Sequence, residues 1–123
     1  MGRVNEARET ALAVLVQCER SGEAVERAIN HRARDMEESR DHATMRRLVY
    51  GVLENRRYLD TVLDTFSARP MAKQKSRARN TLRLALYELL FLGTPPHAAV
   101  DQAVSLLPRK EQATKRYVNA VLR

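Results

Sequence analysis

Apolar residues recur at steps of three and four along almost the whole chain, which is the spacing of one face of an α-helix. The clearest run has apolar residues at positions 45, 48, 49, 52 and 53, as in two turns of an amphipathic helix. Four Gly, four Pro and no Trp among 123 residues leave little material for a turn-rich β architecture. The sequence therefore predicts an all-α fold in a single domain that spans residues 1–123.

Interruptions of this period predict seven helices. The first ends near Ser21 and Gly22, the second follows Gly22, the third starts at Asp41, and a bend or short fourth helix carries Leu59 to Phe66. The fifth runs from Lys75 to Gly93, the sixth from Thr94 to Pro108, and the seventh from Glu111 to Arg123. The side-chain oxygens of Asp41 and Thr94 are predicted to cap the third and sixth helices. The fifth helix is apolar on more than one face, so it is predicted to be the buried central helix.

The net charge of +7 points to an acidic partner, and nucleic acid is the commonest partner of this kind. Residues 65–88 carry six basic side chains against one carboxylate, a net charge of +5, and residues 109–123 carry five against one, a net charge of +4. A polyanion responds to the local potential within a Debye length of about 8 Å, so these two patches are more informative than the total. The alternative for either patch is a helix face that only contacts solvent.

No residue is predicted to carry out catalysis or to hold a metal ion. The four Gly are isolated, so the sequence contains no recognisable nucleotide-binding loop. His31, His42 and His97 lack the spacing of a metal site. Cys18 is the lone cysteine and lies on the apolar stripe of the first helix, so it is predicted to be a buried, inert thiol.

Targeting and membrane signals are not recognisable in the sequence. The N-terminal segment MGRVNEARETALAV has no apolar run of the signal-peptide type, and no stretch approaches the roughly 18 consecutive apolar residues of a membrane span. A single thiol also fits a reducing compartment. We therefore expect a soluble, cytoplasmic protein.

Three segments, DHATMRRLVYGVLENRRYLDTVL, LRLALYELLFLGTPPHAAVDQAV and RYVNAVLR, resemble the NusB family of all-α RNA-binding domains in their order and spacing. The likeness extends from about Ala7 to the end of the chain. More narrowly, ARPMAKQK and PPHAAV resemble the N-terminal domain of the Sun/RsmB family, bacterial methyltransferases that act on cytosine carbon 5 in small-subunit ribosomal RNA. The resemblance implies a seven-helix bundle of two subdomains that binds RNA.

The resemblance also implies three groups of RNA-binding residues. They are Arg8 near the start of the first helix, then Asn55, Arg56, Arg57 and Tyr58 between the third and fourth helices, and finally Lys115, Arg116, Tyr117 and Asn119 around the VNAVL motif. We expect the groups to converge on one surface, where tyrosine rings stack with unpaired bases and arginines neutralise phosphates. The alternatives are structural: the tyrosines could pack at the rim of the core, Asn119 could bond to backbone, and Arg56 and Arg57 could be solvated charges.

The main functional hypothesis is an RNA-binding domain that positions ribosomal RNA for an S-adenosylmethionine-dependent cytosine-C5 methyltransferase. No Pro-Cys nucleophile or cofactor loop occurs here, so S-adenosylmethionine is expected only in a following catalytic domain of the same polypeptide. Antitermination factors of the family have a longer Arg-rich N-terminus, whereas Glu6 and Glu9 accompany Arg3 and Arg8 here. Two alternatives stay open: a free-standing NusB-type antitermination factor that joins a small ribosomal protein, and a module that docks a protein domain without binding RNA.

Overall fold

In the computed structural model, residues 3–34, 36, 39–66 and 70–106 are described. Over these residues the chain forms six α-helices and a short 3-10 helix, without a strand. The helices are α1 (Arg3–Ser21), α2 (Val25–Arg32), α3 (Ser39–Glu54), α4 (Arg56–Phe66), the 3-10 helix η1 (Met71–Lys73), α5 (Ser76–Phe91) and α6 (Pro96–Ser105). The predicted all-α fold is confirmed.

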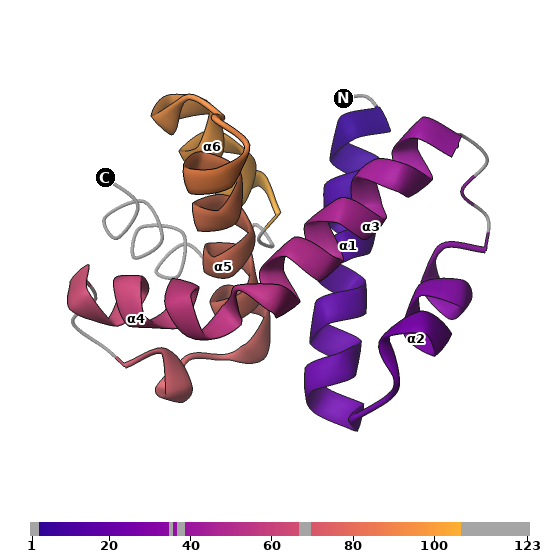
Figure 1. Ribbon diagram of the computed structural model, residues 1–123, viewed down its shortest axis with the longest axis horizontal. Coiled ribbons are helices and arrows are strands. Elements are labelled where there is room, and N and C mark those ends of the chain that lie inside the picture. The colour runs from indigo at the N-terminus through magenta and orange to yellow at the C-terminus, as the bar shows by residue number, and fades with distance from the viewer. Residues whose placement is uncertain (1–2, 35, 37–38, 67–69, 107–123) are drawn as a thin grey trace.

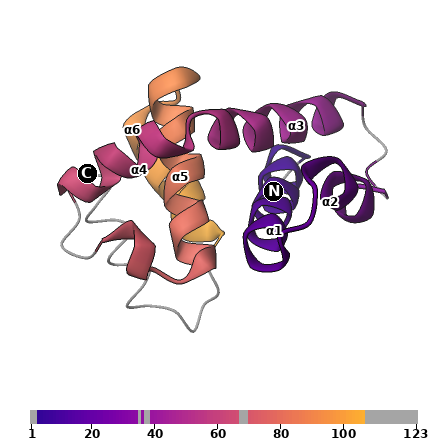
Figure 2. The same ribbon diagram turned by 60° about the horizontal axis from the view of Figure 1, so that its bottom comes forward.

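The helices form two groups that α3 connects. Figure 1 shows α1 and α2 on one side and α4, α5 and α6 on the other, and the turned view in Figure 2 shows the same division. α1 packs against α2 and α3 within its own group and against α5 across the division. None of the described helices combines the length and the apolar character needed to cross a lipid bilayer.

Glycine follows two helices where the sequence predicts their ends. Gly22 after α1 has a φ of +73° and Gly93 after α5 has a φ of +70°. These angles lie in the left-handed region, which a residue without a Cβ enters at little cost. The structure also decides between a bend and a separate fourth helix, because the helical pattern breaks at Asn55 and α4 starts at Arg56.

Other expectations about helix ends were wrong or fall outside the described residues. Asp41 does not precede α3 but lies in its first turn, since the helix begins at Ser39. Pro95, not Thr94, holds the N-cap position of α6, because Thr94 instead donates its backbone N–H to the Glu88 carbonyl at the end of α5. The 3-10 helix η1 was not predicted, and the expected seventh helix, 111–123, lies outside the described residues.

The prediction that α5 is the buried central helix is confirmed over most of its length. All residues from Asn80 to Glu88 are buried. Tyr87 reaches this environment because α3 has a glycine, Gly51, at the contact: a Cβ there would lie 2.5 Å from Tyr87 Cε1 and closer still to Cζ and Oη. Real Cβ atoms essentially never come this close to another heavy atom, so Gly51 is what allows Tyr87 to pack against α3.

We expect Gly51→Ala to lower the free energy of unfolding by about 1–3 kcal/mol, because the new methyl group displaces the Tyr87 ring. Helix propensity alone predicts the opposite sign, a gain of up to about 1 kcal/mol. Urea unfolding measures the difference. In the Tyr87→Ala background the same glycine change should lose its cost, and a stabilising Gly51→Ala in the wild-type background would contradict the packing described here.

Candidate nucleic-acid interface

The α3–α4 junction is built around Asn55. Its backbone N–H donates to the Gly51 and Val52 carbonyls at 3.2 Å each, and its side-chain amide donates to the Gly51 carbonyl at 2.8 Å. Its own carbonyl accepts the Leu59 N–H at 2.9 Å, which is the first hydrogen bond of α4. Asn55 therefore ends α3 and starts α4. In the candidate interface, its observed contacts shape the junction between the two helices.

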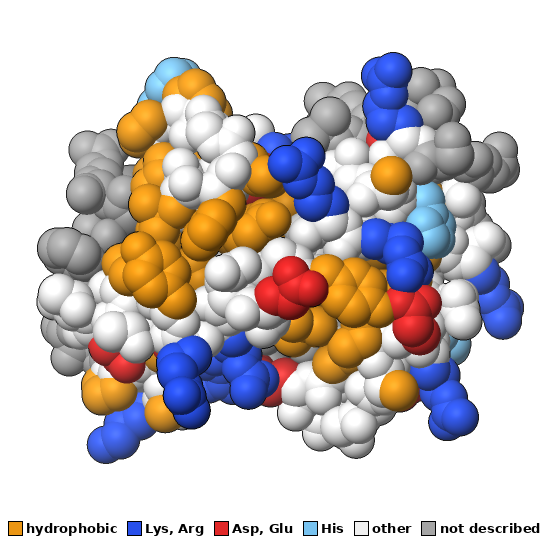
Figure 3. Space-filling model, viewed as in Figure 1, with side chains coloured by type: hydrophobic (Ala, Val, Ile, Leu, Met, Phe, Trp, Pro, Cys, Tyr) orange, Lys and Arg blue, Asp and Glu red, His pale blue; other side chains and the backbone are white. Residues whose placement is uncertain are grey.

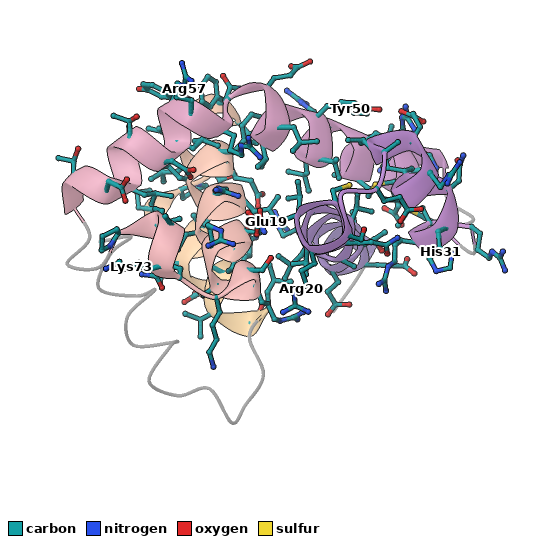
Figure 4. All side chains as sticks on the ribbon, turned by 90° about the horizontal axis from the view of Figure 1, so that it is seen from below. Glu19, Arg20, His31, Tyr50, Arg57 and Lys73 are labelled. Carbon is teal, nitrogen blue, oxygen red and sulfur yellow. The ribbon has the colours of Figure 1, made fainter. Side chains whose placement is uncertain are left out.

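Arg56 and Arg57 lie at the N-terminus of α4, and both are exposed. Neither forms an ion pair with a carboxylate of the described residues. The first turn of α4 contains no acidic residue, so the positive end of the helix dipole adds to the two guanidinium charges. Figure 4 shows Arg57 directed outward from α4. The junction thus offers two exposed positive charges at the surface.

Tyr58 follows the two arginines and is the most exposed large apolar side chain described, at 55%. Its ring packs at a steep angle to Phe91 at the end of α5, with ring centroids 6.3 Å apart. Phe91 in turn stacks on the buried Tyr87 ring, with centroids 5.3 Å apart. The three rings form a ladder, Tyr87 to Phe91 to Tyr58, that begins at Gly51 inside the molecule and ends at the surface.

Leu90 and Phe91 are surface residues that reasoning from the sequence did not identify. Each is 47% exposed, although both belong to the helix predicted to be buried. Figure 3 shows hydrophobic side chains gathered over α5 and α6 on this face. The sequence feature that indicates this exposed surface is the largely apolar run LYELLFL at 86–92. The run extends past Glu88, where the buried part of α5 ends.

Arg8 lies near the start of α1, as the resemblance implies, but it is buried rather than exposed. Its residue is 9% exposed, and its guanidinium donates to both Glu88 carboxylate oxygens, from Nε at 2.9 and 3.1 Å and from Nη2 at 2.7 Å. A two-pronged pair of this kind holds α1 against α5. The structure therefore gives Arg8 a structural role, and we leave it out of the candidate interface. The third predicted group, Lys115, Arg116, Tyr117 and Asn119, lies outside the described residues.

Two of the five described cations in the basic stretch 65–88 are paired with carboxylates inside the fold. Arg79 pairs with Glu19 at 2.7 Å, and Arg83 pairs with Asp60 at 2.7 Å and with Glu19 at 3.1 Å. Arg77 donates to the Leu106 carbonyl at 2.7 Å. The remaining cations described in this stretch are Lys73 and Lys75, which are exposed, and Arg69 lies outside the described residues. A net charge of +5 in the sequence therefore leaves a weaker patch at the surface.

Glu19 is the centre of this network, between α1 and α5 (Figure 4). Burial alone would raise its pKa, but hydrogen bonds from Arg79, Ser76 and Arg83 and the charge of Arg79 outweigh burial and lower the pKa to about 2. Burial likewise disfavours the charged form of Arg83, yet the hydrogen bonds and charges of Asp60 and Glu19 raise the pKa of Arg83 above its ordinary value. Both shifts indicate side chains that stay ionised and paired.

Cys18 and the potential metal ligands of the described residues show neither an activated nucleophile nor a grouped metal site. Cys18 is half-buried, and burial, followed by the charge of Glu23, raises the pKa of its thiol. A raised pKa disfavours the nucleophilic thiolate. The thiol is half-buried, however, and not fully buried as the sequence predicted. Within the described part of the chain, no three His, Cys, Asp or Glu side chains are grouped so that they could hold a metal ion.

We expect Glu19→Gln to destabilise the fold by about 2 kcal/mol at neutral pH, because Arg79 and Arg83 lose their shared counter-charge. The folded-state pKa of Glu19 is depressed, so its contribution to stability is complete above about pH 4.5 and is lost as the pH falls towards 2. Urea unfolding of the wild type and of Glu19→Gln at several pH values should show that their difference in unfolding free energy disappears over this range. Glu9→Gln, an exposed change on the same helix, is the matched control, and a gap that does not depend on pH would contradict the assignment.

Comparisons with known proteins agree with this fold. The transcription antitermination protein NusB of Chloroflexus aggregans is 32% identical over 134 residues, which cover 99% of this chain and 89% of that protein. Ribosomal RNA small subunit methyltransferase B of Escherichia coli is 33% identical over 85 residues, which cover 68% of this chain and 20% of the enzyme. The chain thus matches about a fifth of the length of that methyltransferase.

A solved structure gives the same result. The crystal structure of the antitermination factors NusB and NusE in complex with dsRNA contains a chain that superposes with a TM-score of 0.88 at 23% identity, covering 99% of this chain and 95% of that chain. This likeness shows the shared fold. The family model of the NusB family matches residues 5–123. The chain therefore belongs to the NusB family.

Proposed function

We propose that this protein binds RNA through its α3–α4 junction and acts as a transcription antitermination factor of the NusB type. The observation that carries the proposal is the placement of Arg56, Arg57 and Tyr58: two exposed cations and an exposed ring at the positive end of α4, in a member of the NusB family. Phosphates would meet the arginines, and an unpaired base would meet the ring. The chain would position RNA in the bacterial cytoplasm and carry out no chemical step.

Antitermination is favoured over the methyltransferase hypothesis by the extent of the matches. The match to the NusB relative covers 99% of this chain, whereas the match to the methyltransferase covers 68% of it. The assembly of NusB with NusE and RNA in a solved structure suggests the same partners for this chain. A ribosomal protein of the NusE kind and RNA are therefore the proposed partners.

The second candidate is the one that ARPMAKQK and PPHAAV favoured in the sequence, an RNA-positioning domain of a ribosomal RNA cytosine-C5 methyltransferase. The 33% identity to methyltransferase B over 68% of this chain supports it. In that case S-adenosylmethionine would bind to a following catalytic domain, and the RNA would be small-subunit ribosomal RNA.

NusE from the same bacterium separates the two candidates. For an antitermination factor, we expect NusE to bind the chain and to increase its affinity for RNA, because a second protein adds contacts to the same ligand. Fluorescence anisotropy with a labelled small-subunit ribosomal RNA transcript measures the affinity with and without NusE. RNA binding that NusE leaves unchanged, with no complex by gel filtration, would instead support the methyltransferase candidate.

We expect Arg57→Ala to weaken RNA binding roughly fivefold. It should also reduce the salt dependence by one phosphate contact, which for single strands lowers the slope of log affinity against log salt by about 0.7. Anisotropy titrations over a series of salt concentrations give both values. Arg27→Ala is the matched control, because it removes the same charge from an exposed position on α2, away from the junction.

The double change Lys73→Ala and Lys75→Ala tests the rival patch, which keeps two exposed cations without a neighbouring ring. The proposal expects this variant to bind RNA almost as the wild type does. Loss of binding here, with Arg57→Ala unaffected and circular dichroism unchanged in both, would place the interface elsewhere. If the wild type binds no RNA, the proposed function is wrong and the module that docks a protein domain becomes the better hypothesis.

A further inference from the structure

We propose that Phe91, at the C-terminal end of α5, is a second base-stacking residue that extends the RNA-binding surface from α4 onto α5. The inference rests on the proposed function, since it deepens the RNA site at the α3–α4 junction. Its ligand is an unpaired RNA base beside the base that meets Tyr58.

Phe91 keeps 47% of its surface exposed even though two rings touch it. A phenyl ring at the end of a buried helix usually turns inward, because burying it is favourable. Here Tyr87 is the ring that packs inward, because it fills the space beside Gly51. Phe91 is therefore held outward, with Tyr87 stacked against it.

The ladder also limits the movement of both outer rings. Tyr87 is 8% exposed and contacts α3, Phe91 stacks on it at an interplanar angle of 22°, and Tyr58 meets Phe91 at 79°. Rings that are already ordered lose little conformational entropy when a ligand binds. Two adjacent, ordered and exposed rings are the arrangement that single-stranded nucleic acid uses for successive bases.

The surrounding charge favours RNA over a protein partner as the occupant. Arg56 and Arg57 precede Tyr58 and have no carboxylate partner among the described residues. The carboxylates on α4 are already engaged, because Asp60 is paired with Arg83 and Asp64 accepts the backbone N–H of Met71. Glu54 at the end of α3 is the exposed carboxylate nearest in sequence. Two exposed cations that precede Tyr58 in the sequence, together with the exposed rings of Tyr58 and Phe91, match the phosphates and bases of one RNA strand.

Leu90 provides a matched control, because it is the neighbouring residue and has the same 47% exposure without a ring. The probes are a labelled single-stranded oligoadenylate and the oligoadenylate–oligouridylate duplex of equal length, at low salt. We expect Phe91→Ala to weaken binding of the single strand roughly tenfold and Leu90→Ala to change it less than about twofold. Circular dichroism and thermal unfolding check that both variants fold. Equal losses from both variants would indicate a general apolar docking face and overturn the proposal.

A second variant reports stacking directly. The chain contains no Trp, so Phe91→Trp introduces a single fluorophore at the proposed position. We expect the single strand to quench this fluorescence at the concentrations where anisotropy shows binding, and the duplex to quench it much less, because paired bases have no free face. His31→Trp, an exposed position on α2 far from Arg57 in Figure 4, should stay unquenched.

The outcomes separate the two levels of the proposal. If the Phe91→Trp variant binds the single strand without quenching, the stacking role of Phe91 is wrong while RNA binding stands, and the patch is left to a protein partner. If quenching is equal for single strand and duplex, the base-stacking role is also wrong. If the wild type binds neither these probes nor the ribosomal RNA transcript, the proposed function fails and the inference fails with it.

Discussion

The contact between α1 and α5 depends on the buried ion pair of Arg8 and Glu88. Three hydrogen bonds of 2.7 to 3.1 Å join the two side chains, and neither is more than 10% exposed. Removing one partner of such a pair leaves a buried charge without compensation, which is far more costly than never having the pair. The pair therefore specifies how the two helix groups meet. Glu19, near the other end of α1, adds a second ionic contact to α5 through Arg79 and Arg83.

These contacts also determine which charges remain for a ligand. Arg8, Arg79 and Arg83 are used within the fold, although the sequence alone counts them as part of a strongly basic chain. Among the described residues, no carboxylate forms an ion pair with Arg56 or Arg57. The positive charge of the described surface at the α3–α4 junction thus comes from arginines without a carboxylate partner among the described residues, and α5, held in place by α1, presents Phe91 beside Tyr58.

Much of the fold could be predicted from the sequence because helical period and glycine position are local properties. The ends of α1 and α5 at Gly22 and Gly93 are examples. Side-chain partners between distant helices are not local, so the sequence could not show that Arg8 meets Glu88, eighty residues away. The exposure of Phe91 has the same origin, since it depends on Gly51 of α3 admitting Tyr87. The junction at 55–58 could be located because the polar break between two apolar stripes is itself a sequence feature.

The central claim is that RNA meets the α3–α4 junction and the end of α5. The most direct measurement is a titration of the isotope-labelled protein with single-stranded RNA, followed through the backbone amide signals by NMR. The account predicts that the largest shifts occur at residues 55–58 and at Leu90 and Phe91, with Arg27 on α2 unchanged. Shifts confined to Lys73, Lys75 and their neighbours, with the junction unchanged at saturating RNA, would contradict it.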